Sequence, residues 1–197
     1  MRPKAYFKAL APLLGKPYFT AKEARVVGVS PATLSHYVKT GELKRVGRGV
    51  YTTKSQEFTS LRWEDLVLAV HSTPHGVVCR VSALAIYNLT EEIPRQHWIG
   101  IRHGTSAKKH RGVKIVRFRN LGLGKTEISL DGAVIPIFDR ERTIIDAFRL
   151  LSREIAIKAL KTAIAHGGKN RLDLKKIEAY AKELRFCIAP YLLSVTT

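Results

Sequence analysis

The chain has 197 residues, of which 45% are apolar, and this content supports an ordinary globular core and argues against a disordered protein. Its 34 Lys and Arg residues against 16 Asp and Glu give a formal net charge of +18, so the surface is expected to attract polyanions, chiefly nucleic acid or anionic lipid. The longest uncharged stretches, 66–79 and 187–197, are too short to span a membrane, and two cysteines form no disulfide framework, so we expect a cytoplasmic protein.

Local signals in the first 53 residues predict three helices followed by a hairpin. Thr20 and Glu23 have the spacing of a capping box, which opens a short helix. Ser30 and Pro31 mark the start of another helix, because Pro at the first helical position loses no hydrogen bond, and Gly41 is suited to end it. The predicted elements are helices over about 3–15, 21–27 and 31–40 and strands over 43–46 and 50–53.

The third of these helices has two different faces. Counting 100° per residue places Leu34, Tyr37 and Val38 on one side. The opposite side is small, polar and basic, and it consists of Ala32, His36 and Lys39, flanked by Thr33, Ser35 and Thr40. A helix that enters a DNA major groove needs small residues near its start, groups that hydrogen-bond base edges, and a positive end for phosphate. Taken alone, however, this face also fits a surface helix that binds nothing.

The segment 43–51, LKRVGRGVY, raises a similar question. A Gly-Arg-Gly corner can cradle a nucleotide phosphate, close a plain hairpin, or hold a side chain out toward a larger anion. The two helices before it, separated by the tight turn 27–30, have helix-turn-helix spacing, and the hairpin follows where a wing would lie. We therefore predict a DNA-binding wing. The predicted DNA-binding residues are Ser30, Ala32, Thr33, Ser35, His36, Lys39, Lys44, Arg45 and Arg48.

From residue 61 onward, the pattern is that of an α/β domain with helices at its end. Asp131 and Gly132 between two strand-like runs are a strong hairpin signal, and Ser82 is expected to cap a helix. The predicted elements are helices over 61–70 and 82–89, strands over 97–102, 113–119, 127–130 and 133–138, and helices over 140–151, 153–166 and 173–185.

Signals for other chemistry are weaker. Gly122 to Thr126 looks like the end of a phosphate loop, but Arg119 stands where the first glycine is needed and a strand is expected to follow. Pro74 interrupts any helix that would align His71 with His75, and no acidic or cysteine partner stands at zinc spacing from them. The sequence therefore predicts no metal site, no cofactor and no enzymatic activity.

An acidic cluster at Asp139, Glu141 and Asp146 is the best candidate for a nuclease site. Yet Arg142, Asp146 and Arg149 follow each other at i, i+4 and i, i+3, the spacing of an ion-paired helix face. We expect a solvated structural stripe. The alternative for the same three residues is a contact site for a partner.

The segment FTAKEARVVGVSPATLSHYVKTGELKRVGRGVY resembles the N-terminal winged helix of the AbiEi family of antitoxins. CRVSALAIYNLTEEIP, ISLDGAVIPIFDRERTIIDAF and AYAKELRFCIAPYLLS resemble the antitoxin domain of that family, so the resemblance covers nearly the whole chain. It implies an antitoxin of a bacterial type IV toxin-antitoxin system, which represses its own operon through inverted repeats and counters a nucleotidyltransferase-like toxin. Residues 30–39 and 44–48 match the family's DNA-binding element.

These observations predict an α+β protein with a winged helix-turn-helix domain at residues 1–57 and an α/β antitoxin domain, with a small sheet and C-terminal helices, at 58–197. The expected partners are double-stranded operator DNA and the cognate nucleotidyltransferase toxin. Residues 1–57 hold 11 basic and 3 acidic residues and the remainder 23 and 13, so the second domain could help hold DNA, bind RNA, or simply be soluble by charge.

Two rival functions remain open. A nuclease targeted by the winged helix would need paired acids near a lysine on a strand to hold Mg²⁺. A stand-alone transcription factor that senses a ligand would need a sizeable apolar pocket in the second domain.

Overall fold

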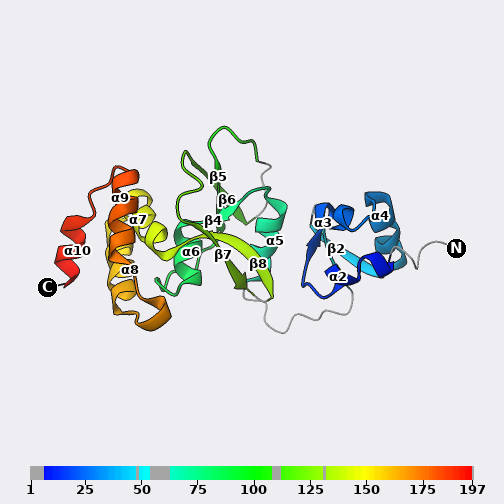
Figure 1. Cartoon of the computed structure of the whole chain (residues 1–197), viewed down its shortest axis with the longest axis horizontal. Coiled ribbons are helices and arrows are strands. Elements are labelled where there is room, and N and C mark those ends of the chain that lie inside the picture. The colour runs from blue at the N-terminus through cyan, green and yellow to red at the C-terminus, as the bar shows by residue number, and fades with distance from the viewer. Residues whose placement is uncertain (1–6, 48, 54–62, 108–111, 131, 197) are drawn as a thin grey trace. The chain divides into compact units, whose positions relative to one another are not determined.

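The structure is a computed structural model that describes residues 7–47, 49–53, 63–107, 112–130 and 132–196 (Figure 1). The chain forms two compact units, the first comprising Met1–Pro74 and Ser129–Ile135 and the second His75–Ile128 and Pro136–Thr197. The mixture of helices and sheets confirms the predicted α+β class. The predicted domain boundary between residues 57 and 58 falls among residues outside the description and stays a prediction.

Two helices of the first unit begin at Ala21 and Pro31, as the local sequence predicts, whereas the predicted start of the first helix near residue 3 lies outside the described residues. Residues 7–9 are helical, and α2 (Ala11–Leu14), α3 (Ala21–Val26) and α4 (Pro31–Thr40) follow. The capping box is confirmed, because the Glu23 amide donates to Thr20 Oγ1 at 3.2 Å while the Thr20 amide donates to Glu23 Oε2 at 2.7 Å. α4 ends at Gly41, whose φ of 79° lies in the left-handed region that favours glycine.

A three-stranded antiparallel sheet completes the winged helix. Its order is β1 (Phe19–Thr20), β3 (Val50–Thr53), β2 (Leu43–Gly47), with an irregular register between Arg45 and Gly47. The sequence predicts β2 and β3 correctly but not β1. This strand has only two residues, Phe19 and Thr20, which pair with Tyr51 and Val50 in a distant part of the chain. Gly49, with φ of 71°, lies in the turn of the wing.

One apolar cluster holds the helices and the wing together. Leu34, fully buried at the centre of α4, packs with Phe19 of β1 and Leu43 of β2. Burying a leucine side chain stabilises a fold by roughly 1.5 to 3 kcal/mol, and the cluster contains nine buried residues, so α4 is held by its inner face. Phe7 adds an edge-on ring contact with Tyr37, at 5.3 Å between ring centroids.

α5 (Glu64–Ser72) also belongs to the first unit. Its bounds differ from those of the predicted helix over 61–70, and residues 61 and 62 lie outside the described part of the chain. Glu64 accepts a hydrogen bond from the hydroxyl of Tyr18 at 3.0 Å.

The larger sheet has five strands in the order β6-β5-β4-β8-β7 (Figure 1). β5 (His97–Arg102) is parallel to β6 (Val113–Phe118), and β4 (Val77–Val78) is antiparallel to β5 and parallel to β8. β8 (Ala133–Phe138) neighbours β7 (Lys125–Leu130), as the hairpin signal predicts. The sequence does not predict the central strand β4, because two valines show no alternation.

Helices complete the second unit. α6 (Arg80–Ile86) lies between β4 and β5 in the chain. The chain ends with α7 (Arg140–Leu150), α8 (Arg153–Ala165), the 3-10 turn Gly168–Asn170, α9 (Leu174–Glu183) and α10 (Ala189–Thr196) (Figure 1). α10 is not predicted by the sequence.

The expectation that Ser82 caps a helix is wrong. Cys79 is the N-cap of α6, and Ser82 lies fully buried inside the helix, where its Oγ accepts a hydrogen bond from the Trp98 amide at 2.9 Å. Ser82 therefore joins α6 to β5. This role depends on a strand 16 residues away and could not be read from the local sequence.

Candidate nucleic-acid interface

The start of α4 is fixed by its own side chains. Ser30 is the N-cap, with its Oγ accepting from the Thr33 amide at 3.2 Å and lying 2.9 Å from Thr33 Oγ1. Pro31 occupies the first helical turn. These contacts fix the first turn of α4, where Ala32 is exposed. Because the alanine side chain is small, a partner can approach this turn closely.

The predicted inner and outer faces of α4 are confirmed. Leu34 and Tyr37 are 0% and 1% exposed, while Ala32, Ser35, His36 and Lys39 are all exposed and Thr33 is half-buried. The two faces follow from the spacing of the apolar residues, because the core takes up Leu34 and Tyr37 and leaves the other side of the helix in solvent.

The hydroxyl groups of α4 are partly occupied by the helix backbone. Ser35 Oγ donates to the Pro31 carbonyl at 3.0 Å, and Thr40 Oγ1 donates to the His36 carbonyl at 3.2 Å. A hydroxyl has one hydrogen, so each of these can offer only acceptor capacity to a base while that bond lasts. His36 and Lys39 are therefore the side chains on this face best placed to donate to an outside partner.

The two described cations of the wing lie on opposite faces of the hairpin. Lys44 and Arg45 are both exposed on β2, and they pair in register with Thr52 and Tyr51. Successive side chains of a strand point to opposite faces, so a partner on one side of the hairpin meets only one of them. Arg45 Nε donates to the Gly47 carbonyl at 3.2 Å, which holds its side chain along the turn. Arg48 lies outside the described residues.

The surroundings of α4 include further charges that the sequence analysis did not assign. Lys22 and Arg25 are exposed on α3, which corresponds to the helix that crosses the DNA backbone in helix-turn-helix proteins. Their separation by three residues, which places both on one face of the helix, is the sequence signal that points to them. Of the acids nearby, Glu23 pairs with Lys16 at 2.8 Å, and exposed Glu42 has its Oε2 3.1 Å from Thr40 Oγ1, as an alternative acceptor for the one hydroxyl hydrogen. Glu42 therefore bounds the positive surface where α4 meets β2.

The expectation of a solvated stripe at Arg142, Asp146 and Arg149 is wrong. The ion pairs exist, with Arg142 Nε at 2.8 Å from Asp146 Oδ2 and Arg149 Nη1 at 2.9 Å from Asp146 Oδ1. However, the side chains of Arg142 and Asp146 are 1% and 0% exposed. Arg142 lies over the Phe118 and Phe138 rings, and α6, α8 and α9 all contact α7. A toxin contact through this pair would require it to open, so Arg149, 30% exposed, is the member available to a partner.

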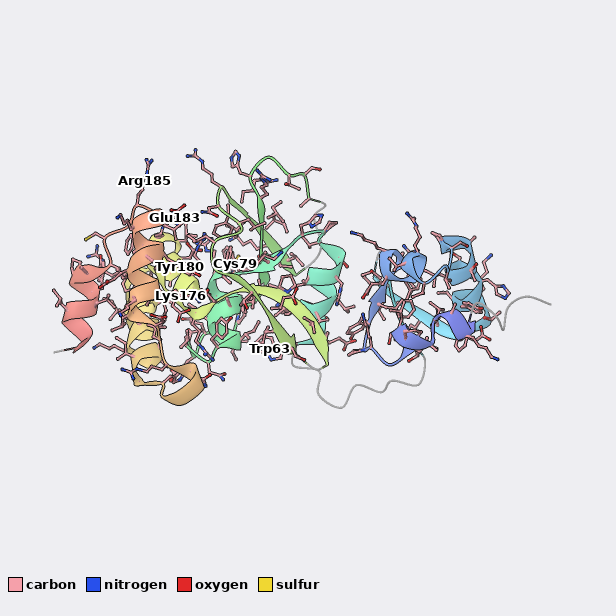
Figure 2. All side chains as sticks on the ribbon, in the orientation of Figure 1. Trp63, Cys79, Lys176, Tyr180, Glu183 and Arg185 are labelled. Carbon is pink, nitrogen blue, oxygen red and sulfur yellow. The ribbon has the colours of Figure 1, made fainter. Side chains whose placement is uncertain are left out.

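The acidic cluster that a nuclease would need is engaged in structural bonds. Asp139 caps α7, with Oδ1 accepting from the Arg142 amide at 2.8 Å, and its Oδ2 accepts from the Tyr180 hydroxyl at 3.0 Å. Lys176 Nζ lies 3.0 Å from the same Oδ2 and 3.5 Å from Glu141 Oε2; Figure 2 labels Lys176 and Tyr180 on α9. Among the described residues, no group of three or more His, Cys, Asp or Glu side chains is arranged to hold a metal ion.

The glycine segment at 122–126 is a turn that leads into β7. Gly124 has φ of 70°, and a Cβ there would lie 2.6 Å from Arg142 Cβ, so glycine is required both by the backbone and by the close approach of α7. A strand starts at Lys125, as predicted, and no helix N-terminus follows to bind phosphate.

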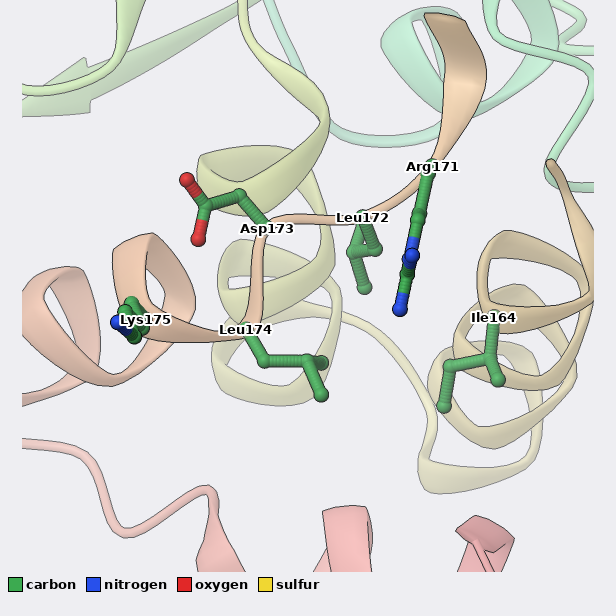
Figure 3. A pocket seen from close by; sticks show the side chains of 6 residues that line it. All are labelled: Ile164, Arg171, Leu172, Asp173, Leu174 and Lys175. Carbon is green, nitrogen blue, oxygen red and sulfur yellow. The ribbon is translucent and has the colours of Figure 1, made fainter. Parts of the chain in front are cut away.

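Two hollows in the second unit bear on the ligand-sensing alternative. One, of about 390 Å³, is lined by six side chains including Ile164, Arg171 and Leu174 (Figure 3). The other, of about 1070 Å³, has Glu91, Glu92, Glu154, Lys158 and Lys161 in its lining. The larger hollow is thus rich in charge, unlike the apolar pocket that ligand sensing requires.

In the described chain, no helix has the length and apolar character needed to cross a membrane.

Comparison with known proteins finds one similarity, in the N-terminal segment. Residues 9–54 match the model of a family described as "Transcriptional regulator, AbiEi antitoxin". No curated protein matches the chain. The matched residues are those that build α2 to α4 and the wing, which agrees with the resemblance found in the sequence. Over residues 9–54 the chain is therefore similar to the AbiEi antitoxin family of transcriptional regulators.

Proposed function

We propose that this protein is a DNA-binding antitoxin that represses its own toxin-antitoxin operon and counteracts a nucleotidyltransferase-like toxin. The single observation that carries the DNA-binding part is the outer face of α4. It is small at its start, polar in its middle and positive at its end, and it belongs to a segment that matches a family of transcriptional regulators.

In this proposal, α4 enters the major groove of operator DNA. Ala32 lets the helix start come close to the base edges, and the exposed His36 ring offers a hydrogen-bond donor or acceptor to them. Lys39, near the end of the helix, binds a phosphate. Ser30, Thr33 and Ser35 supply acceptor oxygens while their local bonds persist.

The wing contributes phosphate contacts or reaches the minor groove. Lys44, Arg45 and Arg48 are its cations, and since Lys44 and Arg45 lie on opposite faces, we expect them to contribute unequally. The hydrogen bond to the Gly47 carbonyl already restricts the Arg45 side chain, so Arg45 loses less conformational entropy when it binds DNA.

Counteraction of the toxin is assigned to residues 58–197 on the resemblance of three segments in that part of the chain to the antitoxin domain. A host that carries the cognate toxin gene and a reporter fused to the operon promoter tests both activities together. The full chain should repress the reporter and restore growth, and the variant His36→Ala/Lys39→Ala/Lys44→Ala should restore growth without repression. Loss of both activities in a folded variant would contradict the division of labour between the two parts.

A further inference from the structure

β7 is an end strand of the five-stranded sheet, where β8 is its neighbour and no other described strand lies along its outer edge (Figure 1). The outer edge of such a strand presents unpaired backbone N–H and C=O groups to any strand that approaches it. Proteins commonly blunt an edge of this kind with proline or lysine. β7 contains no proline, and its one lysine, Lys125, is followed two residues later by Glu127.

The first three residues of β7 are open to solvent on both faces of the sheet. Successive side chains of a strand point to opposite faces, yet Lys125, Thr126 and Glu127 are all exposed. The direction of the backbone follows from the Gly124 carbonyl, which accepts from the Asp139 amide at 2.7 Å, directly after β8. Backbone groups alternate in direction along a strand, so those of Glu127 and the carbonyl of Lys125 face the open edge.

The charges of Lys125 and Glu127 are available to a partner. Both side chains lie on the same face, because they are two residues apart in a strand. Within the described ranges, neither side chain lies within ion-pair distance of an opposite charge. A strand that approaches this edge with the opposite charges at the same spacing would satisfy both.

A second copy of β7 has those charges. When two copies pair antiparallel with Thr126 opposite Thr126, Lys125 of each copy lies opposite Glu127 of the other. Opposite charges directly across a strand pair stabilise it, and like charges destabilise it. The two adjacent registers that keep the same backbone directions set Lys125 against Lys125 or Glu127 against Glu127. The charges therefore select one register.

The backbone groups fit the same register. The Glu127 amide of each copy can donate to the Lys125 carbonyl of the other, which gives two hydrogen bonds between the copies. The Lys125 amide needs no partner from outside, because it donates to the Gly122 carbonyl at 3.1 Å.

The opposite end of the sheet lacks this self-complementarity. The charged residues of β6 are Lys114 and Arg117, so two copies of β6 would bring only cations together. We propose that two copies of this chain associate through the outer edge of β7, by antiparallel pairing around a twofold axis at Thr126. Because the same surface of both copies meets, the contact is closed and stops at the dimer.

The test uses the full chain and two charge reversals. Sedimentation velocity from micromolar to millimolar concentration measures the dissociation constant of the dimer. Glu127→Lys sets lysine against lysine, and Lys125→Glu sets glutamate against glutamate, so each variant alone should have a dissociation constant about tenfold larger than the wild type. An equimolar mixture of the two variants should recover a dimer, because every lysine then faces a glutamate. The double variant Lys125→Glu/Glu127→Lys should recover it as well.

Glu178→Lys and Lys161→Glu, at exposed positions of α9 and α8, are the matched controls and should leave the dissociation constant unchanged. General repulsion between copies with a net charge of +18 predicts tighter association for Lys125→Glu, the opposite of the result expected here.

A wild-type chain that stays monomeric at every concentration would overturn the proposal. So would a mixture of the two reversals that stays monomeric although circular dichroism shows both variants folded, or an equal effect in the controls. The contact requires neither DNA nor toxin, so its failure would leave the proposed function untouched.

Discussion

Arg142 and Asp146 form an ion pair in the interior of the second unit, with Nε and Oδ2 separated by 2.8 Å and side chains 1% and 0% exposed. Arg142 also donates through Nη1 to the Leu123 carbonyl at 3.0 Å and lies over the Phe138 ring, 4.6 Å from its centroid. One buried arginine thus ties α7 to the turn before β7 and to β8.

Removing the acid of this pair should be costly. Asp146→Ala leaves the buried Arg142 charge without its carboxylate, and we expect the free energy of unfolding to fall by about 3 to 5 kcal/mol. Arg149→Ala, which removes the partly exposed partner of the same carboxylate, should cost no more than about 1 kcal/mol. Urea denaturation followed by circular dichroism measures both. Similar small losses in the two variants would show that the buried pair is not a main support of α7.

Glu23 should give the first unit a pH-dependent contribution to stability. Burial acts to raise the pKa of Glu23, but hydrogen bonds from Lys16 and from Thr20 outweigh it and hold the pKa below its ordinary value of 4.5. A lowered carboxyl pKa contributes stability that is fully present above the ordinary value and is lost as the pH falls through the lowered one.

Glu23→Gln keeps the shape of the capping box and removes only the charge. We expect the variant to be less stable than the wild type by about 0.5 to 1 kcal/mol at pH 7, with the difference disappearing near pH 3. Glu178→Gln, an exposed site on α9, serves as the control for loss of one negative charge. A difference that persists unchanged at pH 3 would mean that the charge is not what stabilises the cap.

Lys39→Ala should weaken binding to operator and random duplexes alike. If Lys39 contacts one phosphate, the salt slope should fall by about 0.9 on both DNAs. Arg48→Ala is predicted to act in the same way from the wing. Lys175→Ala, at an exposed lysine of α9, is the matched control in the same anisotropy assay. Unchanged slopes in both Lys39→Ala and Arg48→Ala would count against the assignment of α4 and the wing.

His36→Ala should lower discrimination between sequences more than total affinity. We expect a loss of about 1 to 3 kcal/mol at one base position of the operator, because a side chain that reads a base edge contributes only where that base is correct. Competition binding with single-base operator variants locates the position. Equal losses on operator and random DNA would remove His36 from the base-reading residues.

The sequence by itself determined the features that depend on near neighbours. Thr20 with Glu23 and Ser30 with Thr33 fix two helix starts through bonds across three residues, and apolar spacing fixes which face of α4 is buried. The strand-like stretch at 97–102 and the hairpin signal at Asp131 and Gly132 likewise locate β5 and β8. Local geometry is enough for these features, because the interacting groups are brought together by the helix or strand itself.

Only the tertiary structure decided what lies far apart in the chain. The spacing of Arg142 and Asp146 predicts their ion pair but not its burial, which depends on the rings of β6 and β8 and on the helices that contact α7. The role of Ser82 depends on the Trp98 amide, and the pairing of β5 with β6 depends on a parallel register between separate strands. Burial and surface assembly are set by what packs against an element, and a local pattern does not contain that information.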